Sequence, residues 1–442
     1  MKNKKLFQKI VLIALAVAVF IALVAPAIFS QTPSAPKQEK LLNGLKVLMW
    51  SDAAADKVTI KIRIHAGAAF DPQGREGVMQ LLADNIFPNP ASREFFAEDL
   101  GGGLEIVTNY DYIQINASSK PENFLTMLET LSAAVSNPSI DNDTTVRLRN
   151  ALLTKVASLE ADPSYVADRA VAKRLFGTFP YGRSQYGTAD SLKKIDFADL
   201  TDAKGRFLTA DNATIIISGN FDRALGLKAI RRYFGGWLKA DKKVPSTFKQ
   251  PDEPDTKKLT LELPNLENTY SRFAMVAPAR GDKDYFAMQI LVKLWRDQFN
   301  YNDKNDFECG RNHYQTNLLF GVYSHSQSRP IPKNGELRIN GRNICGSQSS
   351  KNVDGVYPYA EIKQADFDKA KAFIFSDFNQ RIQTTSGLSD LWLDLDTFKL
   401  LSVDAESRKL DSVTLSNVNA LVERFRKTPM VSVLVTSTVT TN

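Results

Sequence analysis

Histidine and cysteine are scarce in this chain, which holds three histidines and two cysteines among 442 residues. His313 and His325 lie near Cys309, but their spacing fits no standard zinc pattern. His65 stands on an expected strand, and we expect it to be a structural residue. A Gly-x-Ser-x-Gly elbow is absent, and Cys309 with His313 has no context that supports a nucleophilic pair. The composition therefore leaves few routes to side-chain catalysis.

The two cysteines, Cys309 and Cys345, allow two interpretations. An oxidising compartment would permit one disulfide between them. Two buried thiols are the alternative, because distance along the sequence says nothing about distance in space.

Acidic residues are missing from the beginning of the chain, where none precedes Glu39. The formal net charge is +7, and Lys2, Lys4, Lys5 and Lys9 supply more than half of that excess. The rest of the chain is close to neutral and has no basic stretch interleaved with aromatic residues. We therefore expect no binding to nucleic acid.

The basic start is followed by an apolar run at 10–24 and by Ala25-Pro26-Ala27. This order is typical of a secretory signal peptide. Extended to Ile28, the run approaches the length that spans a bilayer, so a retained anchor is the alternative. Either way we expect export, to the periplasm or to the periplasmic side of the inner membrane. We expect membrane contact only through this N-terminal segment.

The rest of the sequence divides into two similar halves. We expect a signal peptide or anchor at 1–30, a linker at 31–40, a first domain at 41–240, a charged linker at 241–257 and a second domain at 258–442. Each half opens with two strands and a helix, carries a central strand pair and ends with a strand. This order indicates an internal repeat of two α+β domains.

Periodicity predicts the main elements. We expect strands at 44–50, 58–64, 105–109, 112–118, 213–218, 258–263, 270–276, 316–324, 336–340 and 430–439. We expect helices at 76–87, 93–100, 121–135, 142–160, 164–176, 221–234, 284–299, 365–384, 389–401 and 417–425. Glycines 101–103 follow a helix and precede a strand, which predicts a helix end and turn rather than a phosphate-binding loop.

Two polar residues stand out on the expected helix at 76–87. Gln80 and Asp84 are four residues apart, so they share one helix face. That geometry can present two ligands to one metal ion. A glutamine and an aspartate stand there, however, instead of two histidines.

Several short blocks occur together in a recognisable order. These blocks are Asn43-Gly44-Leu45-Lys46-Val47, Asp71-Pro72-Gln73-Gly74, Asp99-Leu100-Gly101-Gly102, Glu160-Ala161-Asp162-Pro163, Tyr181-Gly182-Arg183, Tyr186-Gly187-Thr188 and Tyr233-Phe234-Gly235-Gly236-Trp237. In this order and spacing the chain resembles the pitrilysin/insulinase metallopeptidases, which include the mitochondrial processing peptidase and the core proteins of the respiratory bc complex. The resemblance is strongest over 41–238. It implies two homologous α/β-roll domains, each a mixed, mainly antiparallel sheet packed against helices.

The resemblance also defines a zinc site that this chain departs from. The family motif is His-x-x-Glu-His, and here Gln80 and Asp84 replace the histidines while Ala83 replaces the general base. The position of the third ligand is Lys155 by the local motif, or Glu160 by raw spacing. Glutamine and protonated lysine are poor zinc ligands, and alanine transfers no proton. We therefore expect neither zinc nor any other cofactor.

Two further expectations follow from the resemblance. Asp84 and Lys155 could form an ion pair where the family holds zinc, because a paired buried charge costs less than a lone one. Active relatives also use an Arg and a Tyr of the second half to hold substrate. Phe320 stands at the Tyr position, and His313 or Arg311 stands at the Arg position.

Together these features predict a protein that is not an enzyme by itself. We expect a non-catalytic subunit that forms a heterodimer with an active zinc peptidase of the same family, completes a closed chamber and binds an extended peptide. A structural or assembly protein of a membrane-associated complex is one alternative. An active zinc metalloendopeptidase with an unrecognised metal site is another.

Overall fold

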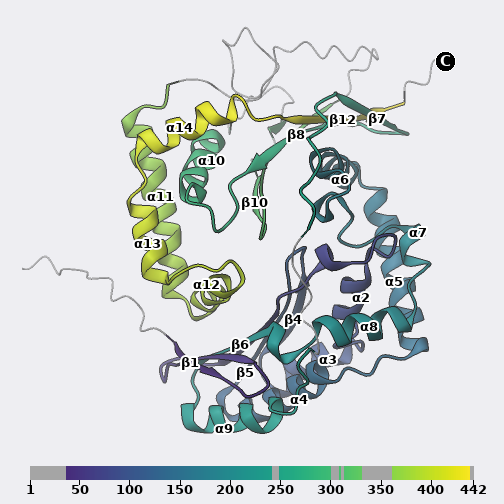
Figure 1. Cartoon of the computed structure of the whole chain (residues 1–442), viewed down its shortest axis with the longest axis vertical. Helices are drawn as coiled ribbons and strands as arrows, with labels where there is room; N and C mark the ends of the chain where they lie inside the picture. Colours follow the sequence, from purple (N-terminus) through teal and green to yellow (C-terminus); the bar gives the residue numbers. More distant parts are fainter. Residues whose placement is uncertain (1–35, 241–247, 300–307, 310–312, 331–360, 439–442) are drawn as a thin grey trace, which may run out of the picture. The chain divides into compact units, whose positions relative to one another are not determined.

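The computed structural model describes residues 36–240, 248–299, 308–309, 313–330 and 361–438 (Figure 1). The first half contains β1 (Lys37–Lys40), β2 (Lys46–Ser51), β3 (Val58–Ile64), η1 (Ala68–Phe70), α2 (Val78–Asp84), α3 (Ala91–Glu94), η2 (Phe95–Asp99), β4 (Gly103–Thr108), β5 (Ile113–Ser119), η3 (Pro121–Asn123), α4 (Phe124–Ser136), α5 (Asn142–Glu160), α6 (Pro163–Phe176), η4 (Pro180–Gly182), α7 (Ala189–Leu192), α8 (Phe197–Phe207), η5 (Ala210–Asn212), β6 (Ala213–Gly219) and α9 (Arg223–Phe234). The second half contains β7 (Leu259–Leu263), β8 (Asn268–Ala277), α10 (Tyr285–Phe299), β9 (Glu308–Cys309), β10 (His313–Thr316), β11 (Gly321–Pro330), α11 (Gln364–Gln383), α12 (Thr385–Thr397), α13 (Val403–Asp411), α14 (Leu415–Phe425) and β12 (Val431–Ser437).

The strand order reveals the internal repeat. The first sheet runs β1-β2-β6-β3-β5-β4, and the second runs β10-β11-β8-β12-β7, with β9 beside β11. In each sheet an early strand of the half lies parallel to the last strand of that half, as β2 does with β6 and β7 with β12. The other pairings are antiparallel. The predicted pair of α+β domains with mixed, mainly antiparallel sheets is confirmed.

Each sheet is covered on both faces. Helices of its own half pack on one face, and one helix of the other half packs on the opposite face. The helix α12 lies against β3 and β6 of the first sheet, and α6 lies against β8 and β12 of the second sheet. Each half therefore contributes one helix that packs on the sheet of the other half.

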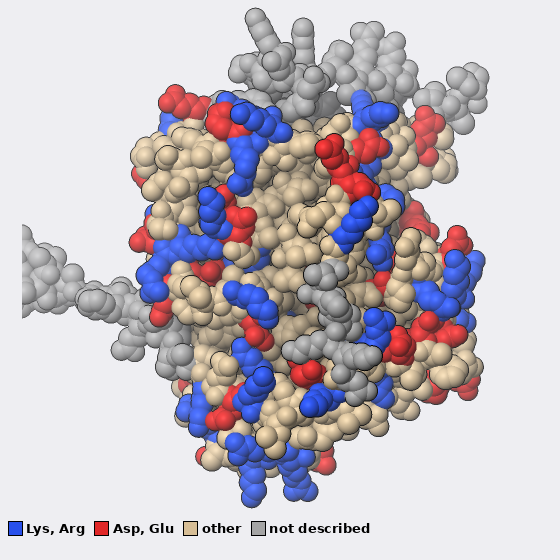
Figure 2. Space-filling view, viewed as in Figure 1, with Lys and Arg blue, Asp and Glu red and all other residues tan. Residues whose placement is uncertain are grey.

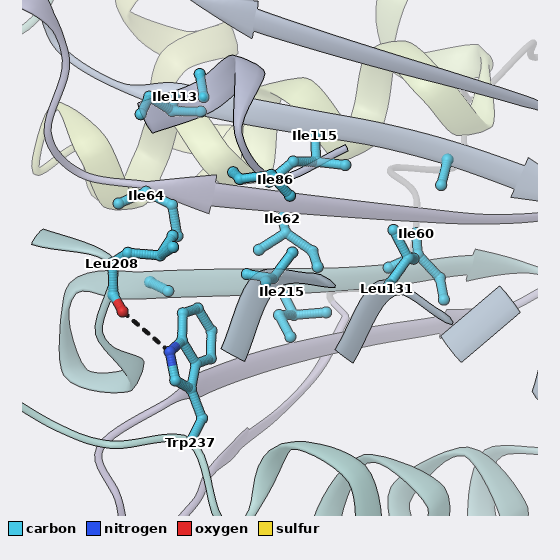
Figure 3. Packing of buried hydrophobic residues seen from close by; sticks show 14 of the residues in the cluster. Ile60, Ile62, Ile64, Ile86, Ile113, Ile115, Leu131, Leu208, Ile215 and Trp237 are labelled. Carbon is cyan, nitrogen blue, oxygen red and sulfur yellow. Dashed lines mark hydrogen bonds between the residues drawn. The ribbon is translucent and has the colours of Figure 1, made fainter. Parts of the chain in front are cut away.

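The strand β3 illustrates how the sequence divides the two faces, because successive side chains point to opposite sides of a sheet. Ile60, Ile62 and Ile64 are fully buried in the core of the first half (Figure 3). In the same core Trp237 donates from Nε1 to the carbonyl oxygen of Leu208 at 3.0 Å. Burying one such apolar side chain contributes roughly 1.5–3 kcal/mol to folding.

Some predicted elements differ from the structure. Residues 37–40 were expected in a linker but form β1, which is held by backbone pairing to β2 rather than by apolar alternation. The single strand expected at 316–324 is wrong, since a turn closed by Asn317 N and Phe320 O separates β10 from β11. The helix α13 was not predicted. The strand expected at 336–340 lies outside the described residues.

The glycines after η2 form the predicted turn. Gly101 has a φ of 66°, and Gly102 N donates to Phe96 O at 2.8 Å. A Cβ atom on Gly102 would lie 1.8 Å from the Ser118 carbonyl oxygen, so only glycine fits there. Across the described ranges, no helix combines the length and the apolar character needed to cross a bilayer.

Candidate functional site: the polar face of α2

The helix α2 is fixed at its start by a buried carboxylate. Asp71 accepts hydrogen bonds from Gly77 N at 2.8 Å and from Met79 N at 2.7 Å, which satisfies two unpaired donors of the first turn. Burial raises the pKa of Asp71 to about 7, although these two bonds favour its charged form. Gly77 begins the helix with a φ of 105°. The helix is therefore shorter than the predicted 76–87.

Gln80 and Asp84 lie on one face of α2 and contact each other. The Gln80 side-chain nitrogen donates to Asp84 Oδ1 at 2.9 Å. Burial raises the pKa of Asp84, whereas this hydrogen bond lowers it. Ala83 is fully buried in the core. Ala83, at the position where the resemblance predicts the general base, thus carries a methyl group packed among apolar side chains.

Lys155 reaches this region from α5, which packs against α2. Its ammonium lies 4.0 Å from the centre of the Tyr186 ring, a cation–π contact. Its charge lowers the pKa of Asp84 through space. Glu160 is not among the groups that shift this pKa. Of the two candidates for the third-ligand position, Lys155 is therefore the one whose charge acts on Asp84.

The direct ion pair that we expected between Asp84 and Lys155 is not formed. Among the described ion pairs, none within 4.0 Å joins these two residues. The physical reason is that each charged group has another partner: the Asp84 carboxylate accepts from Gln80, and the exposed Lys155 ammonium lies over an aromatic ring. The two charges interact only at longer range.

The donors on this face do not fit zinc. A tetrahedral zinc site needs imidazole, thiolate or carboxylate ligands. The face offers one carboxylate, an amide whose nitrogen already donates to it, and an ammonium that repels a cation. In the part of the chain that the structure describes, no group of three His, Cys, Asp or Glu residues is arranged to hold a metal ion.

Phe320 belongs to an aromatic cluster between the two halves. Its ring centre lies 5.9 Å from that of Phe176, 5.4 Å from that of Phe179 and 6.4 Å from that of Tyr181. His313 is the first residue of β10 and pairs with Ser324. Arg311 and Cys345 lie outside the described residues, as does the side chain of Cys309, so the substrate-holding and disulfide predictions stay predictions.

The turn that carries Phe320 is held by a hydrogen-bond network that the sequence did not reveal. The Tyr181 hydroxyl donates to Asp111 Oδ1 at 2.8 Å, and Leu318 N donates to Asp111 Oδ2 at 3.1 Å. Leu319 N donates to the Tyr181 hydroxyl oxygen at 3.3 Å. Burial raises the pKa of Asp111 to about 6. Two residues of the first half thus anchor the β10–β11 turn of the second.

The outward face of β3 meets α12 through charged pairs. Lys61 Nζ lies 2.7 Å from Asp390 Oδ1, and Arg63 Nη1 lies 2.9 Å from Asp394 Oδ1. His65 follows them on the same face. Asp390 and Asp394 are four residues apart, so they lie on one helix face. This spacing was the feature of the sequence that could have indicated a charged contact.

His65 completes this contact. Its Nε2 lies 3.2 Å from Asp396 Oδ2 and 3.0 Å from Thr214 Oγ1. Burial lowers the pKa of His65, and Asp396 partly offsets that effect. Burial tends to raise the pKa of Asp396. Hydrogen bonds from His65, Thr214 and Lys46 outweigh this effect and hold the pKa below its usual range. His65 therefore has the structural partners expected of it.

Comparison with known proteins agrees with the fold. Two halves with the same strand order, each a mixed sheet packed against helices, define a duplicated α+β protein. Residues 46–189 match the family described as "Insulinase (Peptidase family M16)", and residues 194–297 match "Peptidase M16 inactive domain". Together the two matches span more than half of the chain. The chain belongs to the insulinase, or M16, peptidase family.

Two curated relatives are named as subunits of larger assemblies. The probable mitochondrial-processing peptidase subunit beta of Arabidopsis thaliana is 25% identical over 44% of this chain and 38% of its own length. The human cytochrome b-c1 complex subunit 1 is 21% identical over 46% of this chain and 44% of its own length. The chain spans less than two thirds of the length of the curated relatives it matches.

Solved structures share the fold over nearly the whole chain. A protease from Helicobacter pylori superposes with a TM-score of 0.77 at 16% identity, covering 90% of this chain and 99% of that one. A chain of complex III2 from Candida albicans superposes with a TM-score of 0.70 at 15% identity, covering 90% and 95%. These likenesses establish the two-domain fold.

Proposed function

We propose that this protein is a non-catalytic member of the M16 family that acts beside an active zinc peptidase subunit. The observation that carries the proposal is the polar face of α2. Gln80 and Asp84 bond to each other, and Lys155 brings a positive charge toward them. With Ala83 at the base position, this face lacks both the ligands and the proton acceptor that peptide hydrolysis by zinc requires.

Its role would be to complete a peptide-binding chamber. The strand β4 is an edge of the first sheet and packs against α2. An edge strand offers backbone donors and acceptors to which an extended peptide can add as a further strand. Peptide binding beside α2 therefore needs no metal on this chain. The two relatives named as subunits support a role within an assembly.

We further propose that the protein works outside the cytoplasm. The support is the order of a basic start, an apolar run and Ala25-Pro26-Ala27 at the beginning of the sequence. The periplasm, with or without a retained membrane anchor, is the expected location.

Co-purification tests the partnership. A tagged chain should bring down an M16 paralogue with an intact His-x-x-Glu-His, and a quenched fluorescent peptide library should be cleaved only when both chains are present. Recovery of a complex that lacks peptidase activity would favour the structural role instead. Stoichiometric zinc and peptide cleavage by this chain alone would contradict the proposal.

Substitution of the degenerate positions tests the metal argument directly. The triple variant Gln80→His, Asp84→His and Lys155→Glu should bind zinc, measured as metal content after dialysis and as a rise in melting temperature on zinc addition. The wild-type chain should show neither. Ala83→Glu is added only afterwards, in an activity assay, because it places a carboxylate at a buried position. A matched control variant keeps Lys155 and combines Gln80→His and Asp84→His with Glu160→His.

A further inference from the structure

The outer face of α9 is basic. Arg223, Lys228, Arg231 and Arg232 are exposed, while Ala229, Ile230 and Phe234 are buried on the opposite face. No acidic residue lies within the helix. In the described part of the chain these four cations form no ion pair within 4.0 Å. Figure 2 shows Lys and Arg side chains gathered at the lower end of the molecule, where Figure 1 places α9.

Two strongly exposed leucines lie at the C-terminal end of this helix. Leu42, in the turn between β1 and β2, is fully exposed, and Leu238 is 78% exposed. The side chain of Asn43 joins the two segments, since its nitrogen donates to Phe234 O at 2.8 Å and to Trp237 O at 2.9 Å. Leu42 directly precedes Asn43 and Leu238 directly follows Trp237, so the two leucines flank residues that are in contact.

We call this surface the α9 corner, defined by Leu42, Arg231, Arg232, Leu238 and Lys239. Its three cations stand beside two acids that already accept hydrogen bonds. Of these, Asp211 accepts a hydrogen bond from Ala240 N, and Glu129 accepts one from the Tyr233 hydroxyl. Exposed leucines flanked by Lys and Arg match the composition of surfaces that lie at a membrane interface.

We propose that the α9 corner docks on an anionic phospholipid bilayer. Leu42 and Leu238 enter the boundary between headgroups and acyl chains, and Arg231, Arg232 and Lys239 contact lipid phosphates. Anionic headgroups attract such clustered cations within a Debye length of the surface. This docking departs from the expectation that the protein contacts the membrane only through its N-terminal segment.

The length of the chain that precedes β1 favours a membrane over a soluble protein as the occupant. The apolar stretch ends at Ile28, and β1 begins at Lys37. A fully extended chain spans at most about 3.3–3.6 Å per residue, so this connection reaches roughly 30 Å. A retained anchor would therefore hold β1 near the bilayer, and the β1–β2 turn with Leu42 is part of the α9 corner.

Fluorescence quenching in proteoliposomes tests the proposal with the full chain. With Cys309 and Cys345 replaced by serine, a single cysteine at position 42, 238 or 401 carries an environment-sensitive dye. Leu401 is the matched control, since it is 90% exposed and lies between α12 and α13. In vesicles of phosphatidylcholine with phosphatidylglycerol, nitroxide lipids should quench the dye at 42 and 238 but not at 401.

The charges should control this quenching. Reversal at the α9 corner (Arg231→Glu, Arg232→Glu and Lys239→Glu) should lower quenching at 42 to the level at 401. The same reversal at the exposed Lys193 and Lys194 should leave it unchanged. Raising salt from 0.1 M to 1 M, which shortens the Debye length from about 10 Å to about 3 Å, should also reduce it.

Hydrogen exchange on the unsubstituted chain provides a second measurement. Peptides covering 38–44 and 228–239 should exchange more slowly in bilayers that contain phosphatidylglycerol than in pure phosphatidylcholine. Equal quenching at all three positions, or no dependence of exchange on anionic lipid, would overturn the proposal. Protection of these peptides only when another protein is added would assign the surface to that protein instead.

Discussion

At the scale of single residues, burial moves the pKa values of several ionisable groups. His325 lies on β11 with no exposed surface, and burial, aided by the charge of Arg272, lowers its pKa from 6.5 to about 4. Burial acts in the opposite sense on the carboxyls of Asp71 and Asp111, whose pKa values rise to about 7 and about 6. Each shift is also a statement about stability, because it links proton binding to folding.

His325 should make the protein less stable in mild acid. In the unfolded chain it takes up a proton near pH 6.5, whereas in the folded chain it stays neutral down to about pH 4. The unfolded state therefore binds more protons between these values, and stability is lost as pH falls from about 6.5 to about 4. The full effect corresponds to about 3 kcal/mol.

The measurement compares urea unfolding of wild type and His325→Gln at several pH values between 4 and 7.5. The difference between the two proteins should shrink or change sign toward low pH, because glutamine does not titrate. The pH dependence of the wild type alone is not informative. The raised pKa values of Asp71 and Asp111 make the protein less stable as pH rises, which opposes the effect of His325. A difference that stays constant with pH would refute the prediction.

At the scale of elements, the contact between β3 and α12 shows what sequence patterns can and cannot predict. Alternation over 58–64 predicted a strand, and the structure buries its Ile60 and Ile62 in the core. The same alternation could not predict that Lys61 and Arg63 would be covered, since a face under a charged helix and a face under water carry similar residues. The partner helix is more than 300 residues away in sequence.

Sequence patterns are limited in the same way for the polar face of α2. Spacing put Gln80 and Asp84 on one side of a helix, and their hydrogen bond confirms it. The orientation of Lys155 depends instead on Tyr186, which comes from a different segment. Local periodicity cannot predict which of two partners a flexible side chain selects.

Breaking the pair between Arg63 and Asp394 should strongly destabilise the protein. The Arg63 side chain is 2% exposed, and besides Asp394 it donates to Gln114 and Thr397. Arg63→Met leaves a carboxylate without its cation, which costs about 3–5 kcal/mol. The double variant Arg63→Met with Asp394→Leu should recover part of that loss, because no unpaired charge remains.

Urea unfolding of the wild type, the two single variants and the double variant gives the coupling energy. The exposed pair of Arg206 and Asp202 is the control, and Arg206→Met should cost at most about 1 kcal/mol. If Arg63→Met were no more costly than this control, the β3–α12 pairs would not join the halves.

At the scale of the whole molecule, several contacts connect the halves, among them the packing of α6 on β8 and β12, and two others can be tested separately. One is the set of ion pairs between β3 and α12, and the other is the anchoring of the β10–β11 turn by Asp111 and Tyr181. The two share no side chain. The charge of Arg63 reaches Asp111 and lowers its pKa, but no hydrogen bond links the two contacts, so we expect the hydrogen bonds of one to survive the loss of the other.

Tyr181→Phe should loosen the second contact alone. The variant loses the hydroxyl that donates to Asp111 and accepts from Leu319 N, so the buried Asp111 carboxylate and the part-buried Leu319 N each lose a partner. A lost partner of this kind costs about 1–3 kcal/mol. Hydrogen exchange should accelerate in the peptide covering 314–320, while peptides of α12 should keep the wild-type rate. Tyr165→Phe, which removes a hydroxyl bonded to Ser184 within the first half, should change neither. Faster exchange in α12 would mean that the two contacts open together, and the halves would then behave as one cooperative unit.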